Sequence, residues 1–224
     1  MCAVVFDLDG TLVDSEPLSD EAWRRVLADH GHHVSDAELR AVHGLRFSDV
    51  HDRFARRALL PSADVVWIEY SQLLFANFDN RLVAFADAVM TARLLQADGI
   101  ALALATSSPR ERLDRTLAAA NLRALFAVTV AGDEVSRGKP APDGYLAAAR
   151  LLGIEPTRCV AIEDSQAGID AARAAGMKVL AVARPGLPER LTGADLLVDE
   201  VSASSVNRLL TDANGSARQK LGKG

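Results

Sequence analysis

Two aspartates follow an apolar run near the start of the chain. The run covers residues 3–6, and Asp7 and Asp9 flank a leucine just before Gly10. Residues two apart on a strand point the same way, and the glycine indicates a turn, so we expect both carboxylates at the carboxyl end of a buried strand. Two acids this close repel each other, which favours a bound cation or an anionic substrate held by a cation. An aspartate that only caps a turn explains one of these residues but not both.

Hydroxyl groups follow the next apolar run of the same kind. Residues 101–105 lead into Thr106, Ser107 and Ser108, directly before a helical pattern. Hydroxyls together with the free amide groups of a helix N-terminus make an anion-binding site. Helix capping alone also explains these three residues.

Two further loops carry charged groups. Lys139 lies between a glycine and a proline just before a helical pattern, and Glu163 and Asp164 form a second carboxylate pair after the apolar run 160–162. A loop lysine is often solvated surface, but this rigid frame favours a function for Lys139. Four carboxylates, a hydroxyl-lined helix start and a lysine suit Mg²⁺, which takes oxygen ligands and favours substrate phosphate. The imidazole and thiol groups are not arranged for zinc.

The elements that must position these groups alternate between strands and helices. The expected strands after the first are Ile100–Ala105, Phe126–Val130, Val160–Ile162, Val179–Val182 and Leu196–Val198. Strands that alternate with amphipathic helices predict βαβ units, and hence an α/β, Rossmann-like core with a mainly parallel sheet flanked by helices. Ligands bind such sheets at the carboxyl ends of the strands.

A helical block interrupts this pattern after the first strand. It starts near Pro17, continues through a capping box at residues 35–38, and contains helical patterns at 47–60 and 62–78. We predict a core of residues 1–14 and 83–213 and an inserted helical cap domain of residues 15–82. Residues 214–224 have little apolar content and are expected to be disordered. Residues 108–111 predict a second capping box, with Pro109 at the first helical position.

Composition narrows the class of protein. Of 224 residues, 49% are hydrophobic and 25% charged, and the net charge of −5 without a basic block argues against nucleic acid as a partner. The chain has no apolar stretch of about 18 residues that could span a membrane, and the first strand carries site residues, so we expect no signal peptide. Cys2 and Cys159 fit buried free thiols in a reducing compartment. We expect a cytoplasmic monomer.

Four motifs in this order resemble the haloacid dehalogenase superfamily of phosphatases and phosphotransferases. The likeness is closest to its β-phosphoglucomutase-like and sugar-phosphatase group, in the branch with a helical cap after the first strand. The motifs are Asp7-Leu8-Asp9-Gly10-Thr11, Thr106-Ser107-Ser108, Gly138-Lys139-Pro140-Ala141-Pro142-Asp143 and Glu163-Asp164-Ser165-Gln166-Ala167-Gly168-Ile169.

The resemblance implies a role for each of these positions. Asp7 would be the nucleophile that forms an aspartyl phosphate and would also ligate Mg²⁺. Asp9 would act as acid and then base with a free side chain, while its backbone carbonyl faces the metal. Asp164 would ligate Mg²⁺ directly, and Glu163 directly or through water. The expected phosphate- and substrate-binding residues are Thr106, Ser107, Ser108, Lys139, Gly10 and Thr11.

The resemblance also implies a Mg²⁺-dependent phosphatase for a small phosphorylated metabolite, such as a sugar or polyol phosphate. Thr11 stands where the mutases have valine, and Ser19 where they have a cap histidine, so both positions favour hydrolysis. A β-phosphoglucomutase-type phosphotransferase and a non-catalytic phosphate-binding protein are the alternatives.

Residues of the cap should set specificity. The loop at residues 43–46 keeps the family's glycine, Gly44, and a basic residue, Arg46, which either meets a second anionic group of the substrate or faces solvent. His43 and His51 flank the next helix, and their roles stay open. The second linker has Ala86-Asp87 where family members commonly carry Pro-Gly.

Overall fold

The computed structural model describes residues 2–184 and 191–221. Its centre is a six-stranded sheet in the order β5-β4-β1-β6-β7-β8, in which every neighbouring pair is parallel. These strands are β1 (Ala3–Phe6), β4 (Ala101–Ala105), β5 (Val128–Val130), β6 (Cys159–Glu163), β7 (Lys178–Val182) and β8 (Leu196–Val198). The expected strands and the α/β, Rossmann-like class are confirmed, with shifts of one or two residues at the strand ends.

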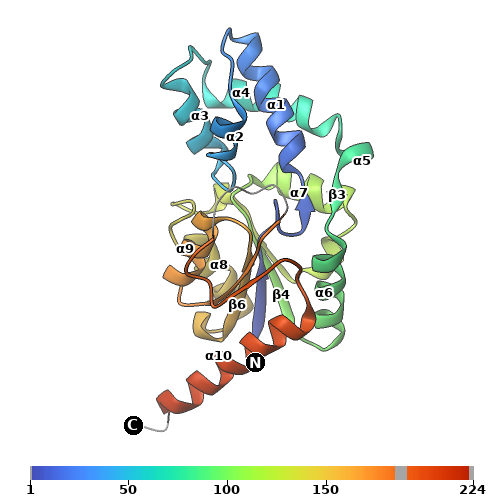
Figure 1. Cartoon of the computed structure of the whole chain (residues 1–224), viewed down its shortest axis with the longest axis vertical. Coiled ribbons are helices and arrows are strands. Elements are labelled where there is room, and N and C mark those ends of the chain that lie inside the picture. Colours follow the sequence, from blue (N-terminus) through green and yellow to red (C-terminus); the bar gives the residue numbers. More distant parts are fainter. Residues whose placement is uncertain (1, 185–190, 222–224) are drawn as a thin grey trace.

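Helices cover both faces of the sheet (Figure 1). They are α6 (Ala86–Ala97), α7 (Arg110–Ala119), α8 (Asp143–Leu152), α9 (Gln166–Ala174) and α10 (Ala203–Leu221), with short 3₁₀ turns at Arg123–Leu125, Gly132–Glu134 and Pro156–Arg158. Alternate residues of β1 point to opposite faces. Phe6 packs in the apolar cluster that includes residues of α6, α7 and α10, whereas Val5 packs with α8 and α9. Burial on both faces explains why these strands are continuous apolar runs.

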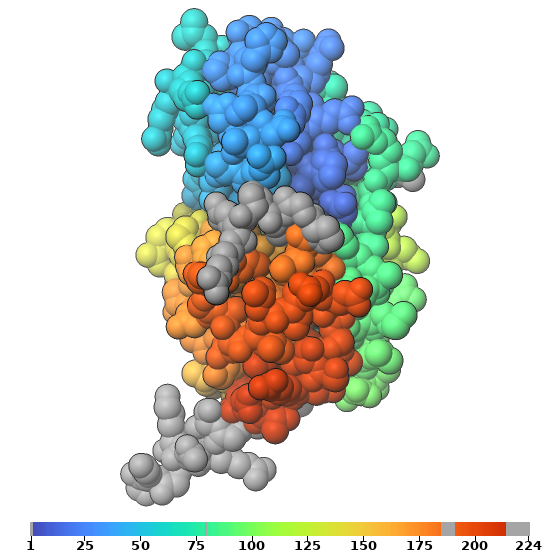
Figure 2. All heavy atoms as spheres, in the orientation of Figure 1, coloured from blue at the N-terminus to red at the C-terminus, as the bar shows by residue number. Residues whose placement is uncertain are grey.

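A group of helices lies beyond the carboxyl ends of the strands (Figure 1). It consists of α1 (Glu16–Asp29), α2 (Asp36–Arg40), α3 (Phe47–Ala55), α4 (Ala63–Phe75) and α5 (Phe78–Arg81), which we call the cap. The cap has its own apolar cluster, in which Trp23, Phe54 and Tyr70 are buried. The capping box at Ser35 and Glu38 is confirmed. Figure 2 shows the blue and cyan cap packed directly on the core. The domain boundaries at residues 15 and 82 stay a prediction.

The two linkers between cap and core pair with each other. Strand β2 (Val13–Asp14) lies antiparallel to β3 (Val83–Ala84), so the chain enters and leaves the cap side by side. The sequence analysis did not predict this pair because two-residue strands are too short to show an alternating pattern.

The structure differs from the sequence prediction at two helices. Helix α7 starts at Arg110 after Pro109, which is the N-cap and makes no side-chain cap hydrogen bond, so the second capping box was wrong. The Ser108 hydroxyl bonds to Asp9 instead. Helix α10 continues to Leu221, past the expected start of the disordered tail. A helix that is already formed adds further turns without a new nucleation step, and residues 217–221 include good helix formers. Residues 222–224 lie outside the described residues.

Two composition-based expectations have structural counterparts. Cys2 and Cys159 are both buried thiols, and burial raises the pKa of Cys159 to about 12. Within the described ranges, no helix combines the length and the apolar character needed to cross a membrane.

Candidate active site

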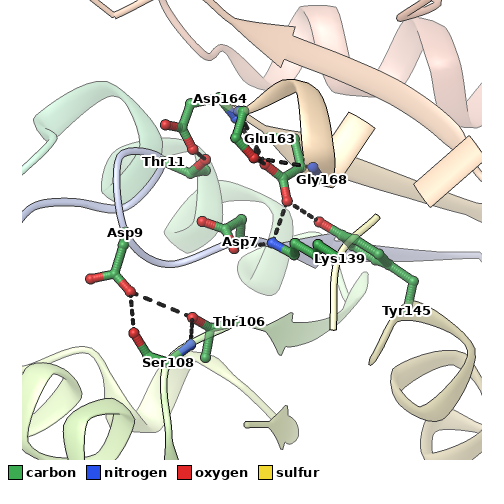
Figure 3. A network of polar contacts seen from close by, with 11 residues as sticks. Asp7, Asp9, Thr11, Thr106, Ser108, Lys139, Tyr145, Glu163, Asp164 and Gly168 are labelled. Atoms are coloured by element: carbon green, nitrogen blue, oxygen red, sulfur yellow. Dashed lines mark hydrogen bonds and ion pairs between the residues drawn. The ribbon is translucent and has the colours of Figure 1, made fainter. Parts of the chain in front are cut away.

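Three neighbouring strands bring the predicted motifs together. Because β1 lies between β4 and β6, the carboxyl ends of these strands meet at one edge of the sheet, below the cap. Asp7 follows β1, Thr106 follows β4, and Glu163 ends β6 with Asp164 directly after it. Figure 3 shows these side chains around one point, joined there by Lys139 from the loop before α8. The four sequence motifs therefore form one site.

Lys139 lies at the centre of this group. Its Nζ forms ion pairs with both Asp7 and Glu163, and all three side chains are at least nine-tenths buried. The Tyr145 hydroxyl donates a second hydrogen bond to Glu163 Oε1 at 2.7 Å. Burial opposes the charge on Lys139, but the two carboxylates outweigh it and raise its pKa above the usual range. Lys139 is therefore a buried cation and not a solvated surface residue.

Three carboxylates beside Lys139 could hold a metal ion. One oxygen each from Asp7, Glu163 and Asp164 lie within 4.8 Å of one another. Burial raises the pKa of Asp7 well above its ordinary value and that of Asp164 to about 8. One lysine does not balance three buried carboxylates, so the site lacks positive charge. A divalent cation with oxygen ligands fits both the charge and the donor atoms.

Gly10 and Thr11 hold Asp164 in place. Thr11 is fully buried and its hydroxyl donates to Asp164 Oδ1 at 2.9 Å. Gly10 has a φ of +83°, and a Cβ there would overlap the Asp164 carboxylate. Only glycine accommodates both the left-handed backbone and this close approach. The structure thus gives both residues a direct contact with the metal-ligand candidate, whereas the sequence analysis placed them on the substrate.

Several neighbouring side chains donate hydrogen bonds to the Asp9 carboxylate. It accepts hydrogen bonds from Ser15, from Ser108 Oγ at 2.6 Å and from Arg112 Nη2 at 2.8 Å. Burial raises the pKa of Asp9, but the Arg112 charge and the two serine hydroxyls lower it further than burial raises it. Ser15, Ser108 and Arg112 thus converge on the turn that holds Asp9, and the assignment of its backbone carbonyl to the metal stays a prediction.

Thr106 supports the same loop. Its Oγ1 accepts a hydrogen bond from the Ser108 backbone amide at 3.0 Å and lies 3.5 Å from Asp9 Oδ2. The hydroxyls of Thr106 and Ser108 therefore face the Asp9 carboxylate and do not cap α7.

Arg112 was missed by the sequence analysis. It lies in the first turn of α7, is 9% exposed, and also donates to the Ser15 hydroxyl at 3.2 Å and to the Tyr70 hydroxyl at 2.9 Å. It therefore joins Asp9 of the core to α4 of the cap. Helical side chains lean toward the N-terminus of their helix, so an arginine in the first turn of a helix that follows a site loop points back toward that loop. This position was the sequence signal that could have identified Arg112.

A small cavity lies between this site and the cap. Its volume is about 50 Å³, enough for a few water molecules but much smaller than a typical ligand pocket. Its walls are Asp7, Asp9, Glu16, Ser19, Asp20, Trp23, Val42, His43, Gly44, Leu45, Phe47, Val50, Tyr70, Thr106, Ser107, Ser108, Pro109 and Arg112. The core and cap residues that line it therefore face the same space.

Two residues of the cap loop were predicted to bind substrate. Gly44 lines the cavity, and its Cβ would lie 3.0 Å from Ser165 Oγ, so a glycine lets the cap loop approach the core here. Arg46 does not reach the cavity. It pairs with Asp49 at 3.0 Å and donates to the Ser136 carbonyl at 3.3 Å, which ties the cap to the core.

Known proteins resemble this chain over most of its length. A family model for haloacid dehalogenase-like hydrolases matches residues 1–176. Hexitol phosphatase A from Escherichia coli is 33% identical over 210 residues, which are 91% of this chain and 93% of that protein. Phosphorylated carbohydrates phosphatase from Thermotoga maritima is 35% identical over 192 residues, covering 80% and 83% of the two chains.

A solved structure shares the fold as well. A mutant of CbbY from Rhodobacter sphaeroides, in complex with xylulose-(1,5)bisphosphate, superposes with a TM-score of 0.80 at 28% identity, covering 89% of this chain and 95% of that one. The match of the family model, the two phosphatase relatives and this shared fold agree with one another. The chain belongs to the haloacid dehalogenase-like hydrolases and is a phosphatase enzyme of that family.

Proposed function

We propose that this enzyme is a Mg²⁺-dependent phosphomonoesterase that hydrolyses a small sugar or polyol phosphate through an aspartyl phosphate on Asp7. The observation that carries the proposal is the placement of Asp7. Its carboxylate is held by Lys139, lies within the acidic group of Glu163 and Asp164, and opens on the cavity that Asp9 also lines. The proposed nucleophile and the proposed acid–base group thus border one space, and the other two metal-ligand candidates, Glu163 and Asp164, lie beside the nucleophile.

Asp7, Asp164 and Glu163 would hold the metal ion, together with the backbone carbonyl of Asp9. Bound there, Mg²⁺ supplies positive charge to the phosphate oxygens. Glu163 already accepts bonds from Lys139, Tyr145 and Ser165, so we propose that it ligates the ion through water.

The first half-reaction transfers the phosphoryl group to the enzyme. A carboxylate oxygen of Asp7 attacks phosphorus, the ester P–O bond breaks, and the leaving oxygen takes a proton from Asp9. Lys139 keeps the attacking carboxylate oriented. Thr106, the Ser107 amide and Lys139 are proposed to hold the phosphoryl oxygens, because charge spread over those oxygens is best met by groups already in place.

The second half-reaction releases phosphate. The ionised Asp9 removes a proton from water, the water oxygen attacks phosphorus, and the bond to Asp7 breaks to give inorganic phosphate. The Arg112 charge favours the ionised form of Asp9, which this step requires, whereas the first half-reaction starts from the protonated form.

The cap would limit the substrate to small esters. The cavity is too small for a sugar phosphate, so the cap must move to admit one and then close around it. Two relatives are named as phosphatases of hexitol phosphates and of phosphorylated carbohydrates, which supports a carbohydrate or polyol ester here.

Phosphate release with Mg²⁺ from sugar, polyol and 2-phosphoglycolate esters tests this proposal, with Asp7→Asn as the control. We expect release by the native enzyme and none by the variant. If β-glucose 1-phosphate, supplied with a bisphosphate primer, is instead converted to glucose 6-phosphate without phosphate release, the enzyme is a mutase and the proposal is wrong.

A further inference from the structure

The cap side of the cavity differs in charge from the phosphate side. We propose that Glu16, Asp20 and His43 form a specificity site for an uncharged or cationic, hydroxyl-bearing leaving group, and that they exclude substrates with a second phosphate or a carboxylate. This inference rests on the proposed function and adds the class of ester to it.

The three residues form one hydrogen-bonded group on the cavity wall. His43 Nε2 lies 2.9 Å from Asp20 Oδ1 and 3.5 Å from Glu16 Oε2, and all three residues line the cavity together with Asp7 and Asp9. Even with His43 protonated, one imidazolium faces two carboxyl groups. The group therefore presents acceptors to hydroxyl or ammonium donors but no surplus positive charge to a second anion.

No other cation of this cavity's described wall is available for a second anion; Arg24, Arg40 and Arg184 line the neighbouring cavity that Glu16, Asp20 and His43 also border. Arg112 is the one arginine or lysine among the described residues that line the cavity beside Asp7, and it is already paired with Asp9 at 2.8 Å. Arg46, which the sequence suggested for this role, bonds to Asp49 and to the Ser136 carbonyl outside the cavity.

The cavity is nevertheless built for a polar molecule. Ser107 and Arg112 are 7% and 9% exposed, and neither Ser107 Oγ nor Arg112 Nε has a hydrogen-bond partner within the described residues. Buried polar groups are nearly always satisfied, so unpaired ones at a cavity indicate a polar ligand. Trp23 and Phe47 stack with ring centroids 5.2 Å apart and add an apolar wall that suits the C–H face of a sugar or polyol.

Matched esters test the selectivity. We would measure kcat/KM with Mg²⁺ for glucose 6-phosphate and glucosamine 6-phosphate, and for 6-phosphogluconate and fructose 1,6-bisphosphate, with p-nitrophenyl phosphate to report the chemistry alone. Because like charges repel strongly in a closed site, we expect the uncharged and cationic esters to exceed the anionic ones by at least about tenfold.

The outcomes separate the two proposals. No hydrolysis of any ester overturns the proposed function and this inference with it. If p-nitrophenyl phosphate is hydrolysed but the anionic esters equal or exceed the others, or none of the four is hydrolysed, only the inference is overturned.

Charge reversal at Asp20 gives an independent test. Asp20→Lys should raise the ratio of kcat/KM for anionic over uncharged esters by at least about tenfold, and Asp20→Asn, which is nearly isosteric, should shift it in the same direction by less. Asp29→Lys is the control, because Asp29 lies exposed on the same helix and pairs with Arg25. An unchanged ratio in folded Asp20→Lys or Asp20→Asn, or an equal shift in Asp29→Lys, would refute the assignment.

Discussion

Replacing Arg112 by methionine tests the contact that joins the core to the cap. The guanidinium donates to Asp9 at 2.8 Å, to Ser15 at 3.2 Å and to Tyr70 at 2.9 Å, and the Arg112 and Asp9 side chains are 10% and 11% exposed. Arg112→Met keeps much of the apolar stem but leaves the Asp9 carboxylate buried without its counter-charge.

The expected cost follows from that burial. Removing one partner of a buried ion pair costs about 3–5 kcal/mol. The loss of unfolding free energy in Arg112→Met should be about 3 kcal/mol, at the low end of this range, because Ser15 and Ser108 still donate to Asp9. For a chain of this length, that lowers Tm by roughly 6–12 °C.

Urea unfolding and thermal melts of the metal-free protein measure this cost. Arg115→Met is the matched control on α7, since Arg115 also contacts the cap, over the Phe75 ring at 4.6 Å, but its ion pair with Glu111 at 3.5 Å is about half exposed. An exposed pair contributes at most about 1 kcal/mol. If Arg112→Met costs no more than Arg115→Met, the buried pair does not stabilise the fold as argued. Adding Asp9→Asn to Arg112→Met should recover part of the loss, because it removes the unpaired charge.

Three further predictions concern the site. Gly10→Ala should lower the free energy of unfolding more than Gly31→Ala, since both glycines have positive φ but only the Gly10 Cβ would overlap Asp164. Urea unfolding should give a loss of about 1–2 kcal/mol for Gly31→Ala. Equal losses in the two variants would contradict the close approach of Gly10 to Asp164. Tyr145→Phe should lose about 1.5–3 kcal/mol, the usual contribution of a hydrogen bond to a charged group, and an unchanged urea midpoint would show that the bond to Glu163 adds nothing. Asp7 and Asp164 have raised pKa values in the metal-free fold, about 8 for Asp164, so the folded state binds more protons than the unfolded chain. The Tm of the metal-free protein should therefore fall as pH rises from about 4 to about 8. Added Mg²⁺ should raise the Tm more near pH 8 than near pH 4. A Tm that rises over this pH range in EDTA would contradict the raised pKa values.

Much of the site could be predicted because its chemistry follows strand ends. Asp7, Thr106 and Glu163 each follow an apolar run, and parallel strands bring such positions to one edge. The order of the strands was not needed for that prediction. Lys139 was also found from sequence, because a glycine and a proline frame it.

The missed features depend on tertiary contacts that no periodicity records. Arg112 lies in a helix with several arginines, and its contacts with the Tyr70 hydroxyl and with the turn at Asp9 distinguish it from Arg115. Arg46 occupies the expected loop, but Asp49 and the Ser136 carbonyl compete for its guanidinium. Asp87, which follows Ala86 in the second linker, likewise has a partner far along the chain, because it pairs with Arg184 at 2.9 Å.

Trapping the phosphoenzyme tests the central claim most directly. A labelled ester is mixed with the enzyme and Mg²⁺, the reaction is quenched in acid within the first turnover, and the labelled peptide is mapped. The account predicts a hydroxylamine-sensitive label on the peptide that contains Asp7, and neither label nor turnover in Asp7→Asn. Label on another residue, or turnover by Asp7→Asn at the native rate, would contradict it.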